Sequence, residues 1–205
     1  MKKTLILLAG YPATGKSYLC SQICSKHPEF CILSQDELKE GLWDQYGFDN
    51  MEEKTVLEMK SWELFYEKMD QEMEAGEQII SDYPFSEKQK GRIRALAEKN
   101  RYQVVTFRLV GDIDTLYQRS RGRDLDPDRH LGHLVSRYHK GDSMEDRSRA
   151  DCLVTQEVFR DRCLNRGYDT FELGHLLEID VTEYEKIDYP GILKQLCDLL
   201  EGEEQ

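Results

Sequence analysis

The sequence lacks the features that mark membrane proteins and zinc proteins. No apolar run approaches the ~18 residues that a membrane-spanning helix needs, so we expect no membrane segment. The six cysteines form no C-x-x-C pair, which argues against a zinc site and favours free thiols in a reducing compartment. The apolar run after Lys2 and Lys3 is short and leads directly into a glycine-rich loop, so we predict a buried strand and no signal peptide. We therefore expect a cytoplasmic protein.

An excess of positive charge is also missing. Lys and Arg total 28 against 40 for Asp and Glu, which gives a formal net charge of -12. A field of this sign repels polyanions, so a long nucleic acid is disfavoured as a partner. A site for a phosphorylated ligand would have to gather Lys and Arg locally.

Internal repeats and low-complexity linkers are absent, and a chain of 205 residues suits a single domain that spans residues 1–205. Apolar segments predict buried strands at Leu5–Ala9, Phe30–Leu33, Gln78–Ser81, Val104–Val110 and Leu176–Ile179. Helical patterns separate them at Lys16–Lys26, Asp36–Trp43, Met51–Ala75, Glu87–Asn100, Ile113–Arg121, Leu153–Arg166 and Tyr189–Leu200. This alternation predicts an α/β fold with a mostly parallel sheet covered by helices on both faces.

The pattern is clearest in the helix predicted over Met51–Ala75. A stripe of apolar side chains repeats there at three- and four-residue spacing, and Gly76 then ends the helix. The stripe consists of Val56, Met59, Trp62, Phe65, Met69 and Met73. We interpret it as core packing in preference to the wall of a ligand cleft.

The stretch from Asp124 to Asp151 has a different character. It is polar, it has no clean period, and it contains Pro127, Gly132 and Gly141. These features predict a mobile lid around residues 120–150 and no contribution to the core.

The segment between the first predicted strand and the first helix reads G-Y-P-A-T-G-K-S, a complete G-x-x-x-x-G-K-S phosphate loop. Such a loop wraps backbone N–H groups around phosphate oxygens and points a helix N-terminus at the anion. Lys16 would contact the β- and γ-phosphates, and the Ser17 hydroxyl would ligate Mg²⁺. The predicted nucleotide-binding residues of the loop are Gly10, Pro12, Ala13, Thr14, Gly15, Lys16, Ser17 and Tyr18.

Asp36 follows the second predicted strand, where side chains face the cleft of an open α/β sheet. It could accept the proton of an attacking hydroxyl. Ser34 and Glu37 also form an S-x-x-E capping box, in which Asp36 would be a helix-start residue, and both roles can hold together. Lys39 could hold an anionic acceptor or be a solvated lysine.

Asp82 follows the third predicted strand. An acidic residue at this position can orient Mg²⁺ or its water shell, so we favour a role on the metal side of the site. The alternative is a turn residue before Tyr83 and Pro84, where Asp is also common.

Basic residues gather from Arg119 onward, which is unusual in an acidic chain. The cluster is Arg119, Arg121, Arg123 and Arg129, followed by His130 and His133. Arg119 and Arg123 lie four apart on one face of a helix that leads into the predicted lid. We favour a role for these two in binding the phosphates and in catalysis. The alternative is surface pairing with nearby aspartates, but such pairs contribute only ~0–1 kcal/mol. We do not favour a metal role for the two histidines.

Together these residues resemble the P-loop small-molecule and polynucleotide kinases of the adenylate-kinase-like branch, which are AAA-type ATP-binding kinases. The group includes polynucleotide 5′-kinases, zeta-toxin-like kinases and chloramphenicol-phosphotransferase-like kinases. The resemblance covers Thr4 to Tyr138 and extends more weakly to Leu200. Its specific parts are Asp36, the I-I-S-D at 79–82, and Arg119 with Arg123 leading into R-H-L-G-H at 129–133.

The resemblance implies a P-loop three-layer sandwich with a five-stranded parallel sheet in the order 2-3-1-4-5, and a lid. It implies Asp36 as general base, Arg119 and Arg123 as lid arginines on the phosphates, and residues 178–182 near the nucleotide base. The chain departs from polynucleotide kinases at Gln35 and Lys39, where those enzymes have arginines. It also has Leu131 where proline is usual in the R-H-P-G-H stretch of many members of the group.

These observations predict an ATP-dependent kinase that uses Mg²⁺ and transfers the γ-phosphoryl group to a hydroxyl of a small acceptor. A polynucleotide 5′-hydroxyl kinase is the alternative enzyme, and the departures at Gln35 and Lys39 weaken it. A nucleotide-dependent switch without an acceptor is the alternative from another class. A GTPase switch would have an N-K-x-D motif, which the sequence does not contain.

Overall fold

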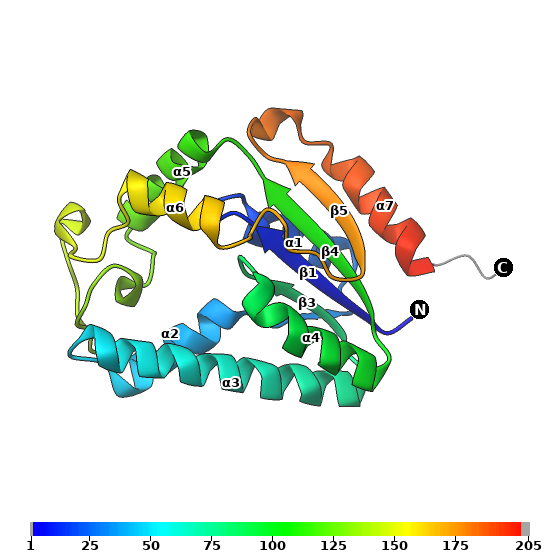
Figure 1. Cartoon of the computed structure of the whole chain (residues 1–205), viewed down its shortest axis with the longest axis horizontal. Helices are drawn as coiled ribbons and strands as arrows, with labels where there is room; N and C mark the ends of the chain where they lie inside the picture. Colours follow the sequence, from blue (N-terminus) through cyan, green and yellow to red (C-terminus); the bar gives the residue numbers. More distant parts are fainter. Residues whose placement is uncertain (1, 202–205) are drawn as a thin grey trace.

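Five parallel strands form the central sheet of the computed structural model, which describes residues 2–201 (Figure 1). The strands lie in the order β2-β3-β1-β4-β5, so the predicted order 2-3-1-4-5 is confirmed. Their bounds are β1 Thr4–Gly10, β2 Phe30–Ile32, β3 Gln78–Asp82, β4 Gln103–Val110 and β5 His175–Asp180. In register, Leu5 of β1 lies beside Ile79 of β3 and Val104 of β4. All the strands therefore end at one edge of the sheet.

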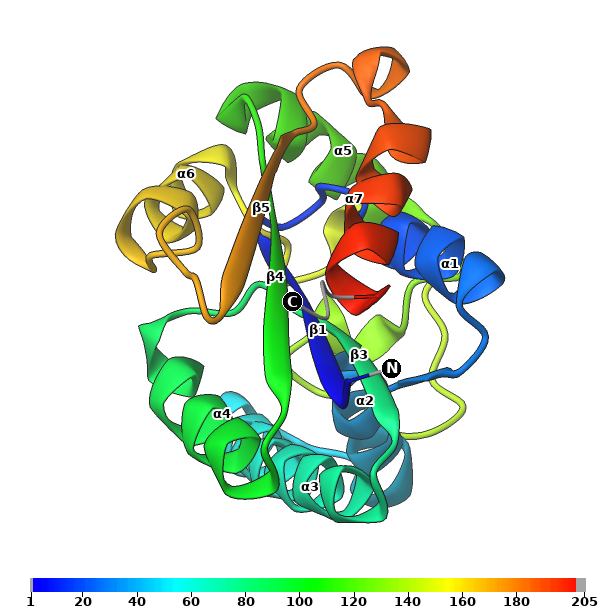
Figure 2. The same ribbon diagram turned by 90° about the vertical axis from the view of Figure 1, so that its right-hand side faces the viewer.

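Seven α-helices surround this sheet in the described part of the chain. They are α1 Lys16–Lys26, α2 Gln35–Tyr46, α3 Met51–Ala75, α4 Glu87–Asn100, α5 Ile113–Leu125, α6 Gln156–Asn165 and α7 Tyr189–Glu201. Figure 2 shows α3 and α4 on one side of the sheet and α1 and α7 on the other. The predicted helices α1, α3 and α4 are confirmed with their bounds. No helix within residues 2–201 combines the length and apolar character that crossing a bilayer requires.

The three layers follow from the pleat of β1, in which every residue is buried. Leu5 and Leu7 pack with side chains of α3 and α4, whereas Ile6 and Leu8 pack with those of α1, α5, α6 and α7. Alternate residues of a strand point to opposite faces, so a continuous apolar strand must be covered on both sides. The sequence of this one strand thus requires a sandwich.

The apolar stripe predicted on α3 is core over only half of the helix. Phe65, Met69 and Met73 are fully buried, but Val56 and Met59 are 63% and 66% exposed. In the N-terminal half of α3 the buried positions include Lys54 and Ser61. The core prediction is therefore wrong for Val56 and Met59. The reason is that this half of α3 packs against α2 beyond the apolar sheet, with a more polar face turned inward.

The stretch after α5 also differs from the prediction of a segment outside the core. Leu131, Leu134, Val135 and Tyr138 are buried and form a third hydrophobic cluster, which includes Trp43 of α2. A backbone bridge pairs Tyr138 with Phe48, with N–H to carbonyl distances of 2.8 Å in both directions. The irregular sequence hid this cluster because its partners come from α2. The mobility of residues 120–150 stays a prediction.

The two halves of α3 can be compared with a matched pair of substitutions. We expect Met73→Ala to lower the free energy of unfolding by about 2–5 kcal/mol, because it removes a fully buried side chain and leaves a cavity. Met59→Ala on the same helix should change it by less than about 0.5 kcal/mol, because Met59 is exposed. Urea unfolding followed by circular dichroism measures both, and equal losses would contradict this account of the helix.

Candidate active site

The phosphate loop connects β1 to α1 at the carboxyl edge of the sheet. Its backbone enters the left-handed region at Gly10, Ala13 and Gly15, with φ values of 102°, 61° and 81°. Glycine is required at position 10 because a Cβ there would lie 2.0 Å from the carbonyl oxygen of Leu109 on β4. Gly15 directly precedes α1, so the first N–H groups of this helix face the loop. The predicted strand–loop–helix context of the motif is confirmed.

Lys16 extends back across the loop. Its Nζ donates hydrogen bonds to the carbonyl oxygen of Tyr11 at 2.6 Å and to the Thr14 hydroxyl at 3.3 Å. Burial lowers the pKa of Lys16 from its ordinary 10.5 to about 8, although nearby Asp82 acts in the opposite direction. Among residues 2–201, no carboxylate forms an ion pair with the desolvated ammonium group of Lys16. An anion in the loop would stabilise the charged lysine and raise its pKa again.

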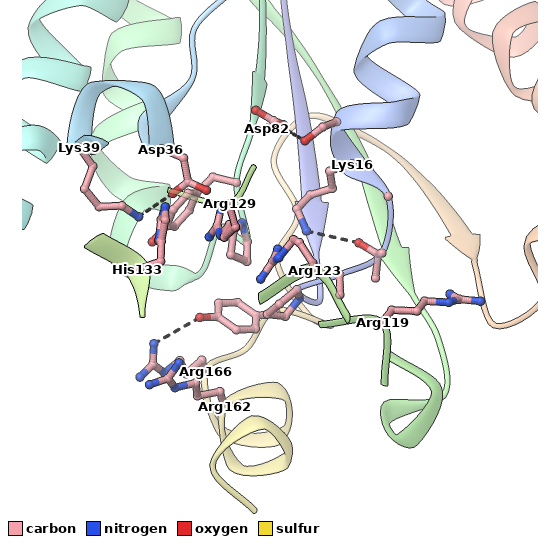
Figure 3. Close-up of a pocket in the computed structure, with 18 of the residues that line it drawn as sticks. Lys16, Asp36, Lys39, Asp82, Arg119, Arg123, Arg129, His133, Arg162 and Arg166 are labelled. Carbon is pink, nitrogen blue, oxygen red and sulfur yellow. Dashed lines mark hydrogen bonds and ion pairs between the residues drawn. The ribbon is translucent and has the colours of Figure 1, made fainter. Parts of the chain in front are cut away.

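Ser17 and Asp82 come together from α1 and the end of β3. The Ser17 hydroxyl donates to Asp82 Oδ2 at 2.7 Å (Figure 3). Burial raises the pKa of Asp82, while this hydrogen bond lowers it in part. Hydroxyl and carboxylate oxygens are hard donors that suit Mg²⁺, which takes few protein ligands and completes its shell with phosphate oxygens and water. Within residues 2–201 no three His, Cys, Asp or Glu side chains form a metal cluster.

Asp36 lies in the first turn of α2, across the cavity from Lys16 (Figure 3). Lys39 Nζ donates to Asp36 Oδ1 at 2.5 Å. Burial would raise the pKa of Asp36, but the charges of Lys39 and Arg129 outweigh it and hold that pKa well below its ordinary value. Asp36 is therefore an ionised carboxylate within a cluster of cations.

The helix-start alternative for this region is present as well. The Ser34 side chain accepts a hydrogen bond from the backbone N–H of Glu37 at 3.3 Å, which is the first half of the predicted capping box. Capping by Ser34 leaves the Asp36 carboxylate free to face the cavity. The two roles considered for the start of α2 are compatible.

The irregular segment after α5 attaches to α2 through side chains beside Asp36. His133 Nε2 lies 2.6 Å from Glu40 Oε1, and His130 Nε2 lies 3.0 Å from Asp44 Oδ1. Arg129 reaches the same Glu40 at only 3.8 Å, and its buried Nε has no hydrogen-bond partner among the described residues. The two histidines therefore act as links to α2, and Arg129 is directed toward the cavity with weak local pairing.

Arg119 and Arg123 of α5 both line the cavity, but their surroundings differ. Arg119 donates to the carbonyl oxygens of Val181 and Thr182 at 2.7 and 2.8 Å, and its guanidinium lies 3.6 Å from the Tyr184 ring centroid. The Arg123 side chain is 45% exposed, and its one ion pair within residues 2–201 is with the neighbouring Asp124 at 3.3 Å. Arg119 is thus held beside the loop after β5, whereas Arg123 has fewer contacts and is more exposed.

Most of the predicted site residues line one cavity of about 630 Å³ at the carboxyl edge of the sheet (Figure 3). Of the predicted set, the cavity wall contains Pro12, Ala13, Thr14, Gly15, Lys16, Ser17, Asp36, Lys39, Asp82, Arg119 and Arg123. Gly10 and Tyr18 are the exceptions: Gly10 ends β1 beneath the loop, and Tyr18 lines a separate hollow with Gly15, Tyr184 and Tyr189.

Arg162 of α6 and Arg166, which directly follows this helix, also line the cavity and were not predicted from the sequence. Arg129 and His133 line it too, without a predicted cavity role. Arg162 and Arg166 lie one helical turn apart, a spacing that could have drawn attention to them. Nothing local indicated that α6 faces the phosphate loop. With them, seven Lys and Arg side chains and two carboxylates line the wall. This concentration of positive charge in a chain of net charge -12 suits a highly charged anion.

Comparisons with known proteins agree with this geometry. Residues 5–139 match a family model described as an AAA domain. No curated protein matches the chain. A candidate kinase from Chloroflexus aurantiacus J-10-fl is similar in structure, with a TM-score of 0.72, 22% identity, and 98% of each chain covered.

Two further solved structures share the fold at lower identity. The shikimate kinase of Bacteroides thetaiotaomicron has a TM-score of 0.54 and 15% identity, covering 97% of this chain and 99% of that one. A sugar kinase from Janibacter sp. HTCC2649 has a TM-score of 0.53 and 13% identity, covering 98% and 95%. At these identities the likeness establishes the fold.

The burial of His133, which outweighs its hydrogen bond to Glu40, predicts a pH dependence of stability. Burial lowers the pKa of His133 from 6.5 to about 4, so between these values the unfolded chain binds a proton that the folded protein does not. His133 should therefore lower the free energy of unfolding as the pH falls from 6.5 to 4, by up to about 1.4 kcal/mol per pH unit.

We expect His133→Gln to reduce this loss between pH 7 and pH 5 in urea unfolding. His175→Gln, at an exposed position on β5, should leave the loss unchanged. An unaltered pH dependence in the His133 variant would contradict a buried neutral imidazole.

Proposed function

The chain belongs to the AAA domain family whose model matches residues 5–139, and we propose that it is an ATP-dependent kinase. It would transfer the γ-phosphoryl group of ATP to a hydroxyl of a small-molecule acceptor. The observation that carries the proposal is one cavity in which the phosphate loop with Lys16 faces the carboxylate of Asp36. A nucleotide-dependent switch would not need a second polar group opposite its phosphates.

The nucleotide would bind with its phosphates in the loop and its base on the adjoining hollow. Tyr18 and Tyr189 form an edge-on aromatic pair there, with ring centroids 5.2 Å apart. The Tyr184 hydroxyl donates to the carbonyl oxygen of Ala13 at 3.2 Å, which ties this hollow to the loop. Arg119, stacked on Tyr184, would support the base and the α-phosphate side of the nucleotide. Residues 178–182 supply the carbonyls that hold Arg119 in place.

Ser17 and Asp82 would hold Mg²⁺ beside the β- and γ-phosphates. When bound, the metal neutralises charge on the phosphate oxygens and helps to align them for transfer. The short Ser17–Asp82 contact already brings the two oxygen donors together. Lys16 would then exchange its loop carbonyl partner for phosphate oxygens, and the desolvation that lowers its pKa would be offset.

Asp36 would orient the acceptor hydroxyl and take its proton. Its depressed pKa makes it a weak base, because Lys39 stabilises the carboxylate. Phosphoryl transfer through a loose transition state places little charge on the attacking oxygen, so the proton can leave late and a weak base is sufficient. The carboxylate stays ionised, which is the state required to accept a hydrogen bond from the hydroxyl.

Arg123 and Arg129 would stabilise the charge that develops on the transferred group. Neither has a strong local partner: Arg123 is half exposed beside Asp124, and Arg129 has only long contacts to Asp124 and Glu40. Weakly paired arginines can turn to the phosphates at small cost, since little is lost when they leave their present partners.

Nucleotide uptake and phosphoryl transfer test the proposal together. We expect calorimetry to detect binding of Mg²⁺-ATP and expect Lys16→Ala to weaken it severely, because the only loop cation is removed. An acceptor screen should include sugars, small hydroxy acids and a 5′-hydroxyl oligonucleotide, with Asp36→Asn as the variant that loses transfer. Binding that survives Lys16→Ala, or transfer that survives Asp36→Asn, would contradict these roles. Preferential phosphorylation of the oligonucleotide would favour the polynucleotide kinase instead.

Arg123 can be tested against a neighbour on the same helix. We expect Arg123→Ala to lower kcat by about 10²-fold or more with little change in nucleotide affinity, because its charge matters most in the transition state. Arg121→Ala is the matched control, since Arg121 does not line the cavity. Equal losses in kcat and nucleotide affinity for Arg123→Ala would argue against a transition-state role.

A further inference from the structure

We propose that the acceptor is a small hydroxylated molecule with an anionic group, a phosphate or a carboxylate, which binds in a second cavity beside Asp36. This inference rests on the kinase function proposed above and specifies the class of its acceptor. The second cavity has a volume of about 330 Å³ and lies between α2, α3 and α6, which suits a small molecule.

The second cavity adjoins the cavity of about 630 Å³ that contains the phosphate loop. Lys39, Tyr83, His133, Arg162 and Arg166 line both. In Figure 3 Lys39 of α2 and His133 of the segment after α5 lie beside Asp36, while Arg162 and Arg166 approach from the C-terminal end of α6. A molecule bound in the second cavity would thus have Asp36 at its open end. Its hydroxyl could meet the γ-phosphoryl group while its other end stays between α3 and α6.

Lys54 of α3 is the strongest indication of an anion. Its side chain lines the second cavity, the residue is 5% exposed, and burial lowers its pKa. Its Nζ donates to the carbonyl oxygen of Val135 at 3.0 Å and lies 5.3 Å from the ring centroids of Trp43 and Phe48. Within residues 2–201 no carboxylate forms an ion pair with it. A buried cation without a counter-ion is costly, and a bound anion would remove that cost.

Arg162 and Arg166 add positive charge on the opposite wall. Neither forms an ion pair with a carboxylate anywhere in the described chain, and the one side-chain contact of Arg166 is a 3.4 Å hydrogen bond to the Tyr168 hydroxyl. Lys39 makes a fourth cation, whereas Glu58 is the single carboxylate on the wall of the second cavity. Arginine forks are suited to phosphate and carboxylate oxygens.

Gln35 shows that the ligand also donates a hydrogen bond. The residue is 1% exposed, and its Nε2 donates to the Ser61 hydroxyl at 2.9 Å. Its Oε1 has no partner among residues 2–201, although Gln35 lines the second cavity. A ligand hydroxyl would satisfy this oxygen. Trp62 and Tyr83, with ring centroids 4.9 Å apart, complete an aromatic wall.

Calorimetry on the full chain can test the second cavity separately from the phosphate loop. The protein is first saturated with Mg²⁺ and a non-hydrolysable ATP analogue, so that added anions cannot bind the loop. Inorganic phosphate, glycerol 3-phosphate, glycerate and glycerol are then titrated. We expect phosphate and at least one charged glycerol derivative to bind and glycerol to bind more weakly. Tighter binding of glycerol 3-phosphate than of glycerate would identify the anionic group of the acceptor as a phosphate. The reverse order would identify it as a carboxylate.

Substitutions then locate the site. Lys54→Met should raise the Kd of the bound anion about tenfold or more and leave the Kd of the ATP analogue unchanged, because Lys54 lines the second cavity and not the first. Arg162→Gln should also raise the Kd of the anion about tenfold or more, because it removes a charge-assisted contact. Lys60→Met is the matched control, since Lys60 is exposed on the same helix and contacts Tyr46. Thermal unfolding establishes whether each variant is folded. If Lys54→Met does not fold, Arg162→Gln alone tests the site.

The inference is overturned if the nucleotide-loaded protein binds no phosphate, or if glycerol binds as tightly as its charged derivatives. It is also overturned if Lys60→Met loses as much affinity for the anion as Lys54→Met and Arg162→Gln. A protein that fails to bind the ATP analogue would instead refute the proposed kinase function. The two failures are therefore distinguishable in one set of titrations.

Discussion

Desolvated positive charge at the carboxyl edge of the sheet is the constraint on which the rest of this structure depends. Lys16 is 9% exposed within a loop whose N–H groups also carry partial positive charge. Five arginines and Lys39 surround the same cavity, in a protein with 12 more negative than positive charges. Such an arrangement is unfavourable unless an anion binds, so the fold holds a site that is completed by its ligand.

The charges are kept in place by carboxylates on α2. Asp36 pairs with Lys39, Glu40 with His133, and Asp44 with His130, at distances from 2.5 to 3.0 Å. These three carboxylates are spaced four residues apart, so they form one row along the helix and face the segment after α5. That row links the proposed base, the cation beside it and the predicted lid. A movement of the lid would therefore alter the surroundings of Asp36 directly.

Several parts of this arrangement could be predicted from local sequence. The strand–loop–helix motif indicated the phosphate site, and the end of β3 indicated Asp82, because both depend on contacts within short segments or at strand ends. The bounds of α3 were predictable from its period and from Gly76, which caps it with φ 84°. The burial of the α3 side chains was predicted only in part. The three- and four-residue spacing predicts Phe65, Met73 and Met59 all as core, but Met59 is exposed in the structure.

The sequence by itself determined the parallel sheet, the phosphate loop and the residues at the strand ends. These features depend on the spacing of apolar residues and on backbone dihedral angles that favour glycine, and both are set by residues close together in the chain. Tertiary structure alone decided that the C-terminal end of α6 brings Arg162 and Arg166 to the loop. It likewise decided that Lys54 is buried with no ion pair to any residue of 2–201. It also decided that Leu131 and Tyr138 pack with Trp43. Those contacts depend on how helices far apart in the sequence pack together. The spacing of apolar residues within one helix does not reveal which side chains of another helix it will meet.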